Sequence, residues 1–133
     1  MSIHPSISPQ KHRLQANINI NLAPQVLTIS PPWAVVVAFY AALHYLDEYA
    51  SYYGVCFLNH TERRNWLSSR IELRSIEIQY EMLYKRSRLV RYDCPGPNHF
   101  LNKKDDVAIM LPWANNIRDS ITQAEIAAGF VGN

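Results

Sequence analysis

One stretch of the sequence constrains the fold more than any other: 11 consecutive apolar residues run from Trp33 to Leu43. Continued past His44 to Leu46, the stretch is 14 residues long. A membrane-spanning helix needs about 20 such residues, so this stretch is too short to cross a bilayer. A helix that is apolar almost all round must be enclosed by protein. We therefore expect it to be the central helix of a bundle, and we expect no membrane segment.

Signals on both sides set the bounds of this helix. Ser30 precedes Pro31 and Pro32. Serine supplies an N-cap oxygen, and proline at the first helical positions loses no hydrogen bond. No Gly or Pro interrupts residues 33–53, and Gly54 suits the C-terminal cap. One helix over this whole segment is predicted.

The N-terminal segment is less regular. Residues 1–10 contain two prolines and are expected to form a flexible arm. In residues 11–21, isoleucine and leucine alternate with asparagine, which suits a strand as well as a helix. We interpret this segment as a helix that ends at Pro24. At the other end of the chain, residues 129–133 are expected to be frayed.

The second half of the chain predicts further helices. Ser68 and Ser69 divide a region free of Gly and Pro into helices near 60–70 and 72–90. The "DCPGPN" sequence at 93–98 is a turn. Apolar spacing then predicts a last helix that Pro112 kinks or breaks. The fold class is therefore all-α, a four- to five-helix bundle of up-and-down type. With 133 residues and 48% apolar side chains, the chain is expected to form one domain.

Composition excludes some classes of site. Cys56 and Cys94 show no zinc or redox spacing, so we expect buried free thiols and no cofactor. No basic-then-apolar leader with a cleavage site is present, and we expect a cytoplasmic protein. The net charge is only +2, but the segment from His60 to Tyr92 holds eight Lys or Arg and four acids. Such a segment is typical either of a phosphate-binding face or of a solvated helix face with ion pairs.

Several segments in this order resemble the HEPN family of small helical domains. They are the long central helix "WAVVVAFYAALHYLDEYASYYG", then "HTERRNWL", then "IQYEMLYKRSRLVRYD" and a helix after a turn. The resemblance covers roughly residues 31–122. It implies a helical bundle that often forms a homodimer. It also implies, for many members, a metal-independent ribonuclease of a toxin, defence or RNA-processing system, with an antitoxin or other partner protein in some cases.

The catalytic motif of the family is absent in its usual form. That motif is R-x4–6-H, contributed by both protomers, but the corresponding positions after Arg64 are Ser69, Arg70 and Ile71. The pair Arg91 and His99 is separated by seven residues and the sequence "CPGP". Members that have lost the motif bind RNA, nucleotides or protein. An inactive binding module is therefore the alternative to a nuclease.

A reversed arrangement of the same residue types is present in "NHTERRNWL". His60 lies three and four residues before Arg63 and Arg64, so on a helix the imidazole and a guanidinium share a face. Metal-free RNA cleavage needs a proton acceptor and a cation for the phosphorane charge. His44, on the preceding helix, can supply a second imidazole. The alternative hypothesis is that His60 only caps a helix while the arginines face solvent.

Other candidate sites follow from the same segments. Several cations near one helix end predict phosphate contacts, and an aromatic residue follows them; these residues are Arg86, Arg88, Arg91 and Tyr92. His44-x-x-Asp47 resembles half of a di-metal motif, but no second half exists, so we expect no metal site. The tyrosines at 45–53 either stack on bases or, as we prefer, pack between helices. An unrelated helical interaction protein is the remaining hypothesis.

Overall fold

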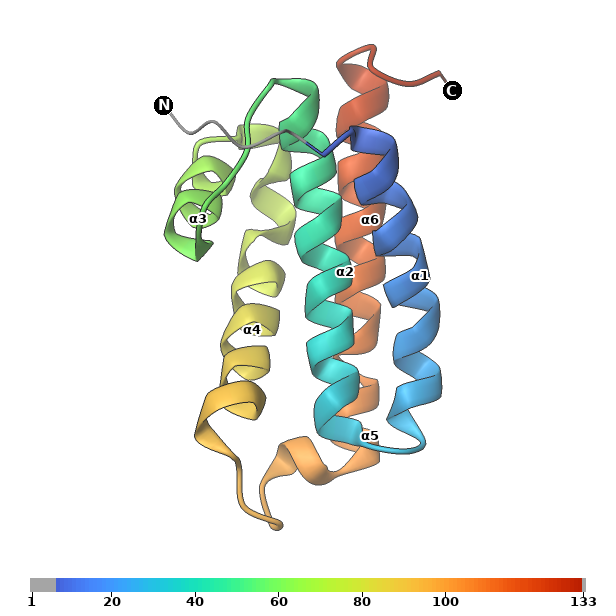
Figure 1. The fold of residues 1–133 in the computed structure, drawn as a ribbon, viewed down its shortest axis with the longest axis vertical. Coiled ribbons are helices and arrows are strands. Elements are labelled where there is room, and N and C mark those ends of the chain that lie inside the picture. The colour runs from blue at the N-terminus through green and yellow to red at the C-terminus, as the bar shows by residue number, and fades with distance from the viewer. Residues whose placement is uncertain (1–6, 133) are drawn as a thin grey trace.

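The computed structural model describes residues 7–132, and every regular element in this part of the chain is helical. Four long helices lie side by side and alternate in direction, which confirms the predicted all-α bundle (Figure 1). The α-helices are α1 (Pro9–Leu27), α2 (Pro31–Tyr52), α3 (His60–Ser68), α4 (Glu77–Arg88), α5 (Lys104–Ala108) and α6 (Leu111–Ala127). None of the helices in the described range is long and apolar enough to cross a membrane.

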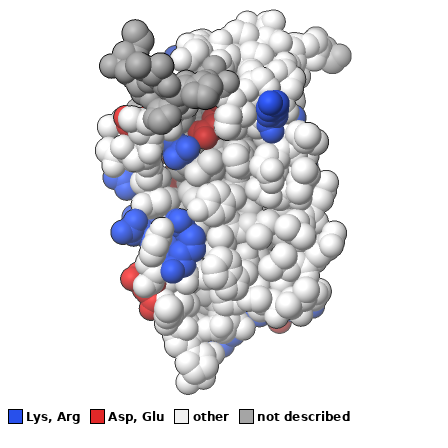
Figure 2. Space-filling view, in the orientation of Figure 1, with Lys and Arg blue, Asp and Glu red and all other residues white. Residues whose placement is uncertain are grey.

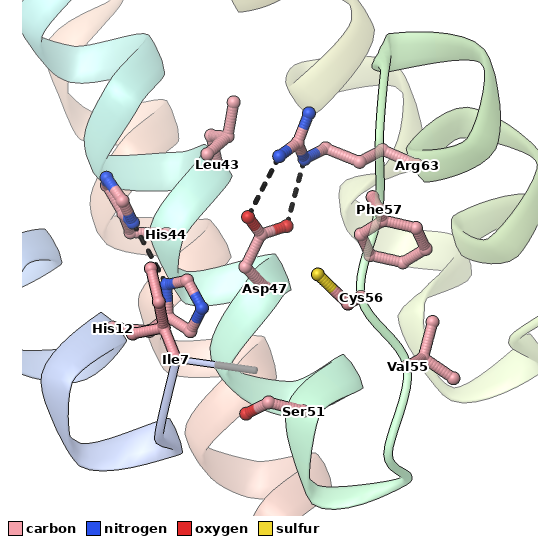
Figure 3. Close-up of a pocket in the computed structure, with 10 residues that line it drawn as sticks. All are labelled: Ile7, His12, Leu43, His44, Asp47, Ser51, Val55, Cys56, Phe57 and Arg63. Atoms are coloured by element: carbon pink, nitrogen blue, oxygen red, sulfur yellow. Dashed lines mark hydrogen bonds and ion pairs between the residues drawn. The ribbon is translucent and has the colours of Figure 1, made fainter. Parts of the chain in front are cut away.

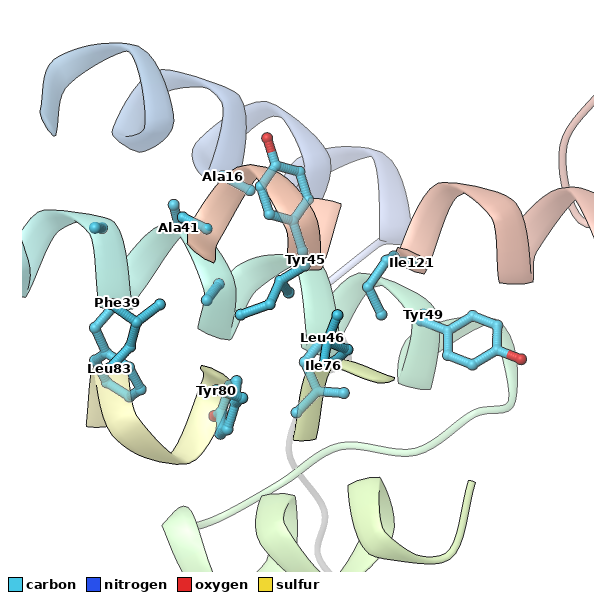
Figure 4. Packing of buried hydrophobic residues seen from close by; sticks show 14 of the residues in the cluster. Ala16, Phe39, Ala41, Tyr45, Leu46, Tyr49, Ile76, Tyr80, Leu83 and Ile121 are labelled. Carbon is cyan, nitrogen blue, oxygen red and sulfur yellow. The ribbon is translucent and has the colours of Figure 1, made fainter. Parts of the chain in front are cut away.

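Helix α2 forms the centre of the bundle, as its sequence predicts. It contacts α1, α4 and α6, and most of its apolar side chains are buried, although Trp33 at its start is 51% exposed. Phe39 and Leu46 of α2 pack in one cluster with Leu83 of α4 and Ile121 of α6 (Figure 4). Small residues such as Ala16 line the α1 side, where short side chains let two helices approach closely.

The predicted ends of α2 are confirmed. Ser30 is the N-cap residue and the two prolines begin the helix, although the Ser30 hydroxyl makes no capping hydrogen bond. Gly54 has φ +72°. Its N–H donates to the Ser51 carbonyl at 3.0 Å, and the Val55 N–H donates to the Ala50 carbonyl at 3.0 Å. These two bonds form the Schellman arrangement, which needs a left-handed residue and explains the glycine.

The helical interpretation of residues 11–21 is confirmed, but its expected bounds are wrong. Helix α1 begins at Pro9, inside the expected arm, and the Ser8 hydroxyl accepts a bond from the Lys11 N–H. The rest of the arm, residues 1–6, lies outside the described residues. The helix also continues through Pro24 to Leu27. Ala23 and Leu27 are buried in the two apolar clusters, and this packing offsets the hydrogen bond that proline removes.

The remaining boundaries follow the sequence signals closely. A 3-10 turn at Ile71–Ile76 separates α3 from α4, as the two serines predict. Pro112 is the second residue of α6, so it marks a break rather than a kink. The tail is more ordered than expected, because Phe130 stacks on Tyr52 with ring centroids 4.7 Å apart. Residue 133 lies outside the described part.

The expectation of buried thiols is wrong for both cysteines, since each is exposed. Cys56 lies in the loop between α2 and α3, outside the helical core. Cys94 ends the π-helical turn at Leu89–Asp93 with φ +47°. Neither cysteine belongs to a buried apolar cluster of the bundle, so an average tendency of cysteine toward burial does not apply.

Two carboxyl groups are buried together between α1, α2 and α6. Glu48 and Glu125 are 3% and 1% exposed, and both contact Arg13. Burial, and next the neighbouring Glu125, raise the pKa of Glu48 to about 8 against the opposing effect of Arg13. One guanidinium cannot balance two carboxylates in a desolvated site, so one carboxyl group keeps its proton at neutral pH.

This raised pKa predicts a stability that depends on pH. Glu48 has an ordinary pKa of 4.5 when unfolded and about 8 when folded, so between these values the folded chain holds a proton that the unfolded chain has lost. The free energy of unfolding should therefore fall by about 1–3 kcal/mol as pH rises from 5 to 8. Glu125→Gln should reduce this slope in urea titrations, because it removes the second of the two causes that raise the pKa of Glu48 and leaves its burial in place. The surface variant Asp119→Asn should keep it, and an unchanged slope in Glu125→Gln would contradict the assignment.

Candidate functional site

A groove lies between α2 and α4, next to the start of α3. It encloses about 390 Å³ and is lined by side chains from all three helices and from the π-helical turn. Five of the eight predicted site residues line it: His60, Arg63, Arg88, Arg91 and Tyr92. In Figure 2, Lys and Arg atoms gather over α4 beside this groove, whereas the side of the molecule formed by α1 and α6 is mostly uncharged.

His60 lines the groove with both ring nitrogens buried, and it does not cap its helix. The capping is done by Asn59, whose side-chain oxygen accepts the Glu62 N–H at 2.9 Å. The Glu62 carboxylate in turn accepts the Leu58 N–H at 2.7 Å. These bonds satisfy two backbone N–H groups at the start of α3, in an arrangement close to a capping box. The imidazole of His60 is therefore not needed for capping.

The surroundings of His60 favour its neutral form. Its ring is parallel to the Tyr84 ring, with centroids 3.2 Å apart. Its Nε2 atom lies 3.4 Å from the Glu81 carboxylate. Burial lowers the pKa of His60 below its ordinary 6.5, and Arg64 and Arg63 add to this while Glu81 opposes it. A neutral imidazole at pH 7 can accept a proton.

The two arginines next to His60 are each held by a carboxylate. Arg63 donates two hydrogen bonds to Asp47, at 2.9 and 3.0 Å (Figure 3). Burial lowers the pKa of Arg63, but the Asp47 bonds outweigh it and the net shift is upward. Arg64 lies outside the groove and binds Glu81 at 2.7 Å. The positive charge of each guanidinium near His60 is thus offset within the protein.

Arg88 and Arg91 differ, because their partners in the structure are uncharged. Arg88 donates to the Tyr84 hydroxyl at 3.3 Å. Arg91 donates to the Tyr40 hydroxyl at 3.2 Å and to the Ser87 hydroxyl at 3.1 Å. Neither forms an ion pair with any residue from 7 to 132. Both keep a full positive charge at the groove.

Tyr92 lies at the rim of the groove and is 64% exposed. The guanidinium carbons of Arg88 and Arg91 lie 5.3 and 5.0 Å from its ring centre. Arg86 does not join them, because it lies over Phe100 and outside the groove. Three of the four residues predicted for nucleic-acid contact are therefore together, and the fourth is on another face.

His44 lies in a neighbouring cavity and not beside His60. Its Nδ1 atom lies 3.1 Å from the Nδ1 atom of His12, in α1 (Figure 3). Tyr40 and His44 are four residues apart on α2, but Tyr40 lines the groove while His44 lies on the far side of the Asp47–Arg63 pair.

Side chains that the sequence suggested as metal ligands are used otherwise. Asp47 binds Arg63, and Glu48 faces α1 and α6. Within residues 7–132, no group of three His, Cys, Asp or Glu is placed to hold a metal ion. The buried tyrosines Tyr45 and Tyr49 pack between helices, as preferred.

The two tyrosines of the groove that hold its arginines were not predicted as site residues from the sequence. Tyr40 and Tyr84 line it and accept hydrogen bonds from the two arginines. Tyr84 precedes Arg88 by four residues, a spacing at which two helical side chains meet. The contact between Tyr84 and Arg88 could therefore have been predicted from the sequence. The contact of Tyr40 with Arg91 joins residues 51 positions apart and has no local signal.

Comparisons with protein-family models, with curated proteins and with solved structures found no match to this chain.

Proposed function

We propose that this chain is an RNA-associated, HEPN-like helical domain that holds the phosphates of single-stranded RNA in the groove between α2 and α4. The observation that carries the proposal is the pair Arg88 and Arg91, which face the groove without an acidic partner among the described residues. Guanidinium groups bind phosphate oxygens through charge-assisted hydrogen bonds. The hydroxyl groups of Tyr40 and Tyr84 hold both groups in place before a ligand arrives.

The aromatic rim favours a single strand over a duplex. Tyr92 is exposed beside both arginines, and every base has a flat face that can stack on such a ring. Bases in a duplex are already stacked on each other and cannot do this. The same groove suits a nucleotide, which offers the same phosphate and base chemistry.

We also propose that the domain forms a homodimer through the outer face of α1. Leu14, Ile18 and Leu22 form an exposed apolar stripe at four-residue spacing, with 62%, 51% and 40% of each exposed. No Asp, Glu, Lys or Arg occurs between Arg13 and Asp47. A twofold dimer sets one patch against its own copy, so an uncharged patch meets no like-charge repulsion. A partner protein on this face is the alternative occupant.

Replacing the two groove arginines tests the RNA proposal. We expect the double variant Arg88→Gln/Arg91→Gln to bind a short labelled single-stranded RNA about tenfold more weakly at 50 mM salt. The slope of log affinity against log salt should fall by about 1.4, because each lost phosphate contact removes about 0.7. Fluorescence anisotropy at several salt concentrations measures both quantities.

The matched control is Arg74→Gln/Arg118→Gln, which changes the net charge equally but lies outside the groove. It should bind within about twofold of the unchanged protein. Equal weakening by both double variants would mean that charge alone attracts RNA, and would contradict a site in the groove.

The homodimer is tested by sedimentation velocity on the unchanged protein, which gives the mass of the species in solution. A 15.3 kDa species at all concentrations would contradict the homodimer.

Metal-independent RNA cleavage is a second candidate function, favoured by the position of His60 in the same groove as Arg88 and Arg91. His60 would take the proton of a ribose 2′-hydroxyl once its ring, whose nitrogens are both buried, turns out of its stack on Tyr84. The 2′ oxygen would then bond to phosphorus while the bond from phosphorus to the 5′ oxygen breaks, and the imidazolium would return the proton to that oxygen. The arginines would stabilise the charge on the phosphorane. Such an activity suits a toxin or defence protein.

Cleavage by this route predicts activity that survives excess chelator. His60→Ala should lower the rate by about 100-fold or more, because the proton acceptor is lost. The rate should rise with pH and level off below pH 6.5, since the pKa of His60 is lowered and its neutral form is the active one. Gel assays of labelled RNA measure both. His99→Ala, outside the groove, is the control and should cleave at the unchanged rate. Cleavage that persists unchanged in His60→Ala would contradict a catalytic role for His60.

A further inference from the structure

A second cavity of about 470 Å³ lies on the other side of the Asp47–Arg63 pair. It is enclosed by the start of α1, the last turns of α2 and the loop that leads to α3 (Figure 3). Its walls are mainly apolar, from Leu43, Val55 and Phe57 among others. A volume of this size and an apolar lining with a few polar groups are typical of small-molecule sites.

The charges at this cavity cancel. Asp47 and Arg63 are its formally charged lining residues. Two hydrogen bonds of 2.9 and 3.0 Å join them, so their opposite charges offset each other. A ligand with a net charge would lose its hydration here and find no counter-ion in return. The cavity therefore favours an uncharged occupant.

The two histidines of the cavity also remain uncharged. Their Nδ1 atoms are 3.1 Å apart, so one nitrogen must donate and the other must accept. Two protonated rings would place two N–H groups head to head. Burial lowers the pKa of both His12 and His44, and the nearby Arg63 acts in the same direction while Asp47 opposes it. The pair is neutral at pH 7.

This pairing leaves hydrogen-bonding capacity inside the cavity. Each neutral ring uses its Nδ1 atom on the other, so its Nε2 atom stays available. Figure 3 shows the Nε2 atom of His12 turned toward the space between Asp47, Cys56 and Ser51. The Ser51 hydroxyl already donates to the Glu48 carbonyl at 2.7 Å, so it can only accept from a ligand. The cavity therefore has hydrogen-bonding groups at one end, from His12 and Ser51, and mainly apolar walls elsewhere.

We propose that this cavity binds a small uncharged molecule with an apolar ring body and one hydrogen-bonding head group. The ring lies in the space beside Leu43 and Cys56, and the head group meets the Nε2 atom of His12. This site is separate from the RNA groove and does not depend on the function proposed for it.

Three probes that share one ring system test the charge requirement. They are 2-naphthol, 2-naphthoate and 2-naphthylmethylammonium, which are neutral, anionic and cationic at pH 7. Titration calorimetry on the full chain should give saturable 1:1 binding of 2-naphthol. Each charged probe should bind at least about tenfold more weakly, because its charge is desolvated without a partner. Charged probes that bind as tightly as 2-naphthol, or the absence of saturable binding, would overturn the proposal.

The location is tested by filling the cavity. Cys56→Trp should weaken 2-naphthol binding at least about tenfold, because the Cys56 side chain points into the space that His12 faces and an indole there occupies the ring site (Figure 3). Ile29→Trp adds the same side chain at an 84% exposed position and should leave binding unchanged. If Cys56→Trp fails to fold, the His12 ring resonances of the unchanged protein provide the readout. They should shift saturably with 2-naphthol, and unshifted His12 signals at saturation would place the ligand elsewhere.

Discussion

The whole architecture depends on the burial of α2. Its apolar residues from Trp33 to Leu46 leave few polar positions, so other helices must cover it on several sides. Helices α1, α4 and α6 do this, and each presents small or apolar residues to it. The order and short connections of these helices then leave little freedom in topology. The second cavity lies where α2 first carries polar side chains, whereas the groove meets α2 at Phe39, Tyr40 and Leu43, at the end of its apolar stretch.

The Asp47–Arg63 ion pair organises the polar end of the molecule. It ties α3 to α2 and stands between the groove and the second cavity. Because it neutralises Arg63, the positive charge of the groove comes from Arg88 and Arg91 instead. The same neutralisation leaves the second cavity without net charge. One pair thus separates a cationic surface from an apolar chamber.

Local signals were sufficient for most of the fold. The caps at Ser30 and Gly54 follow from short-range chemistry and are confirmed. Pro24 was misjudged because the packing of α1 against α2 outweighs one lost hydrogen bond. At the site, helical geometry of about 100° per residue places Arg86 and Arg88 on opposite faces, which the sequence alone could have indicated. Contacts such as His12 with His44 join distant segments and have no such signal.

The central claim is that single-stranded RNA lies in the groove between α2 and α4. NMR of the ¹⁵N-labelled protein during titration with a short single-stranded RNA tests it most directly. The account predicts saturable shifts of the Arg88 and Arg91 side-chain Nε–H signals and of backbone amides lining the groove. Amides along the outer face of α1 should stay unchanged. Shifts centred on α1 or α6, or equal shifts at Arg74 and Arg118, would contradict the account.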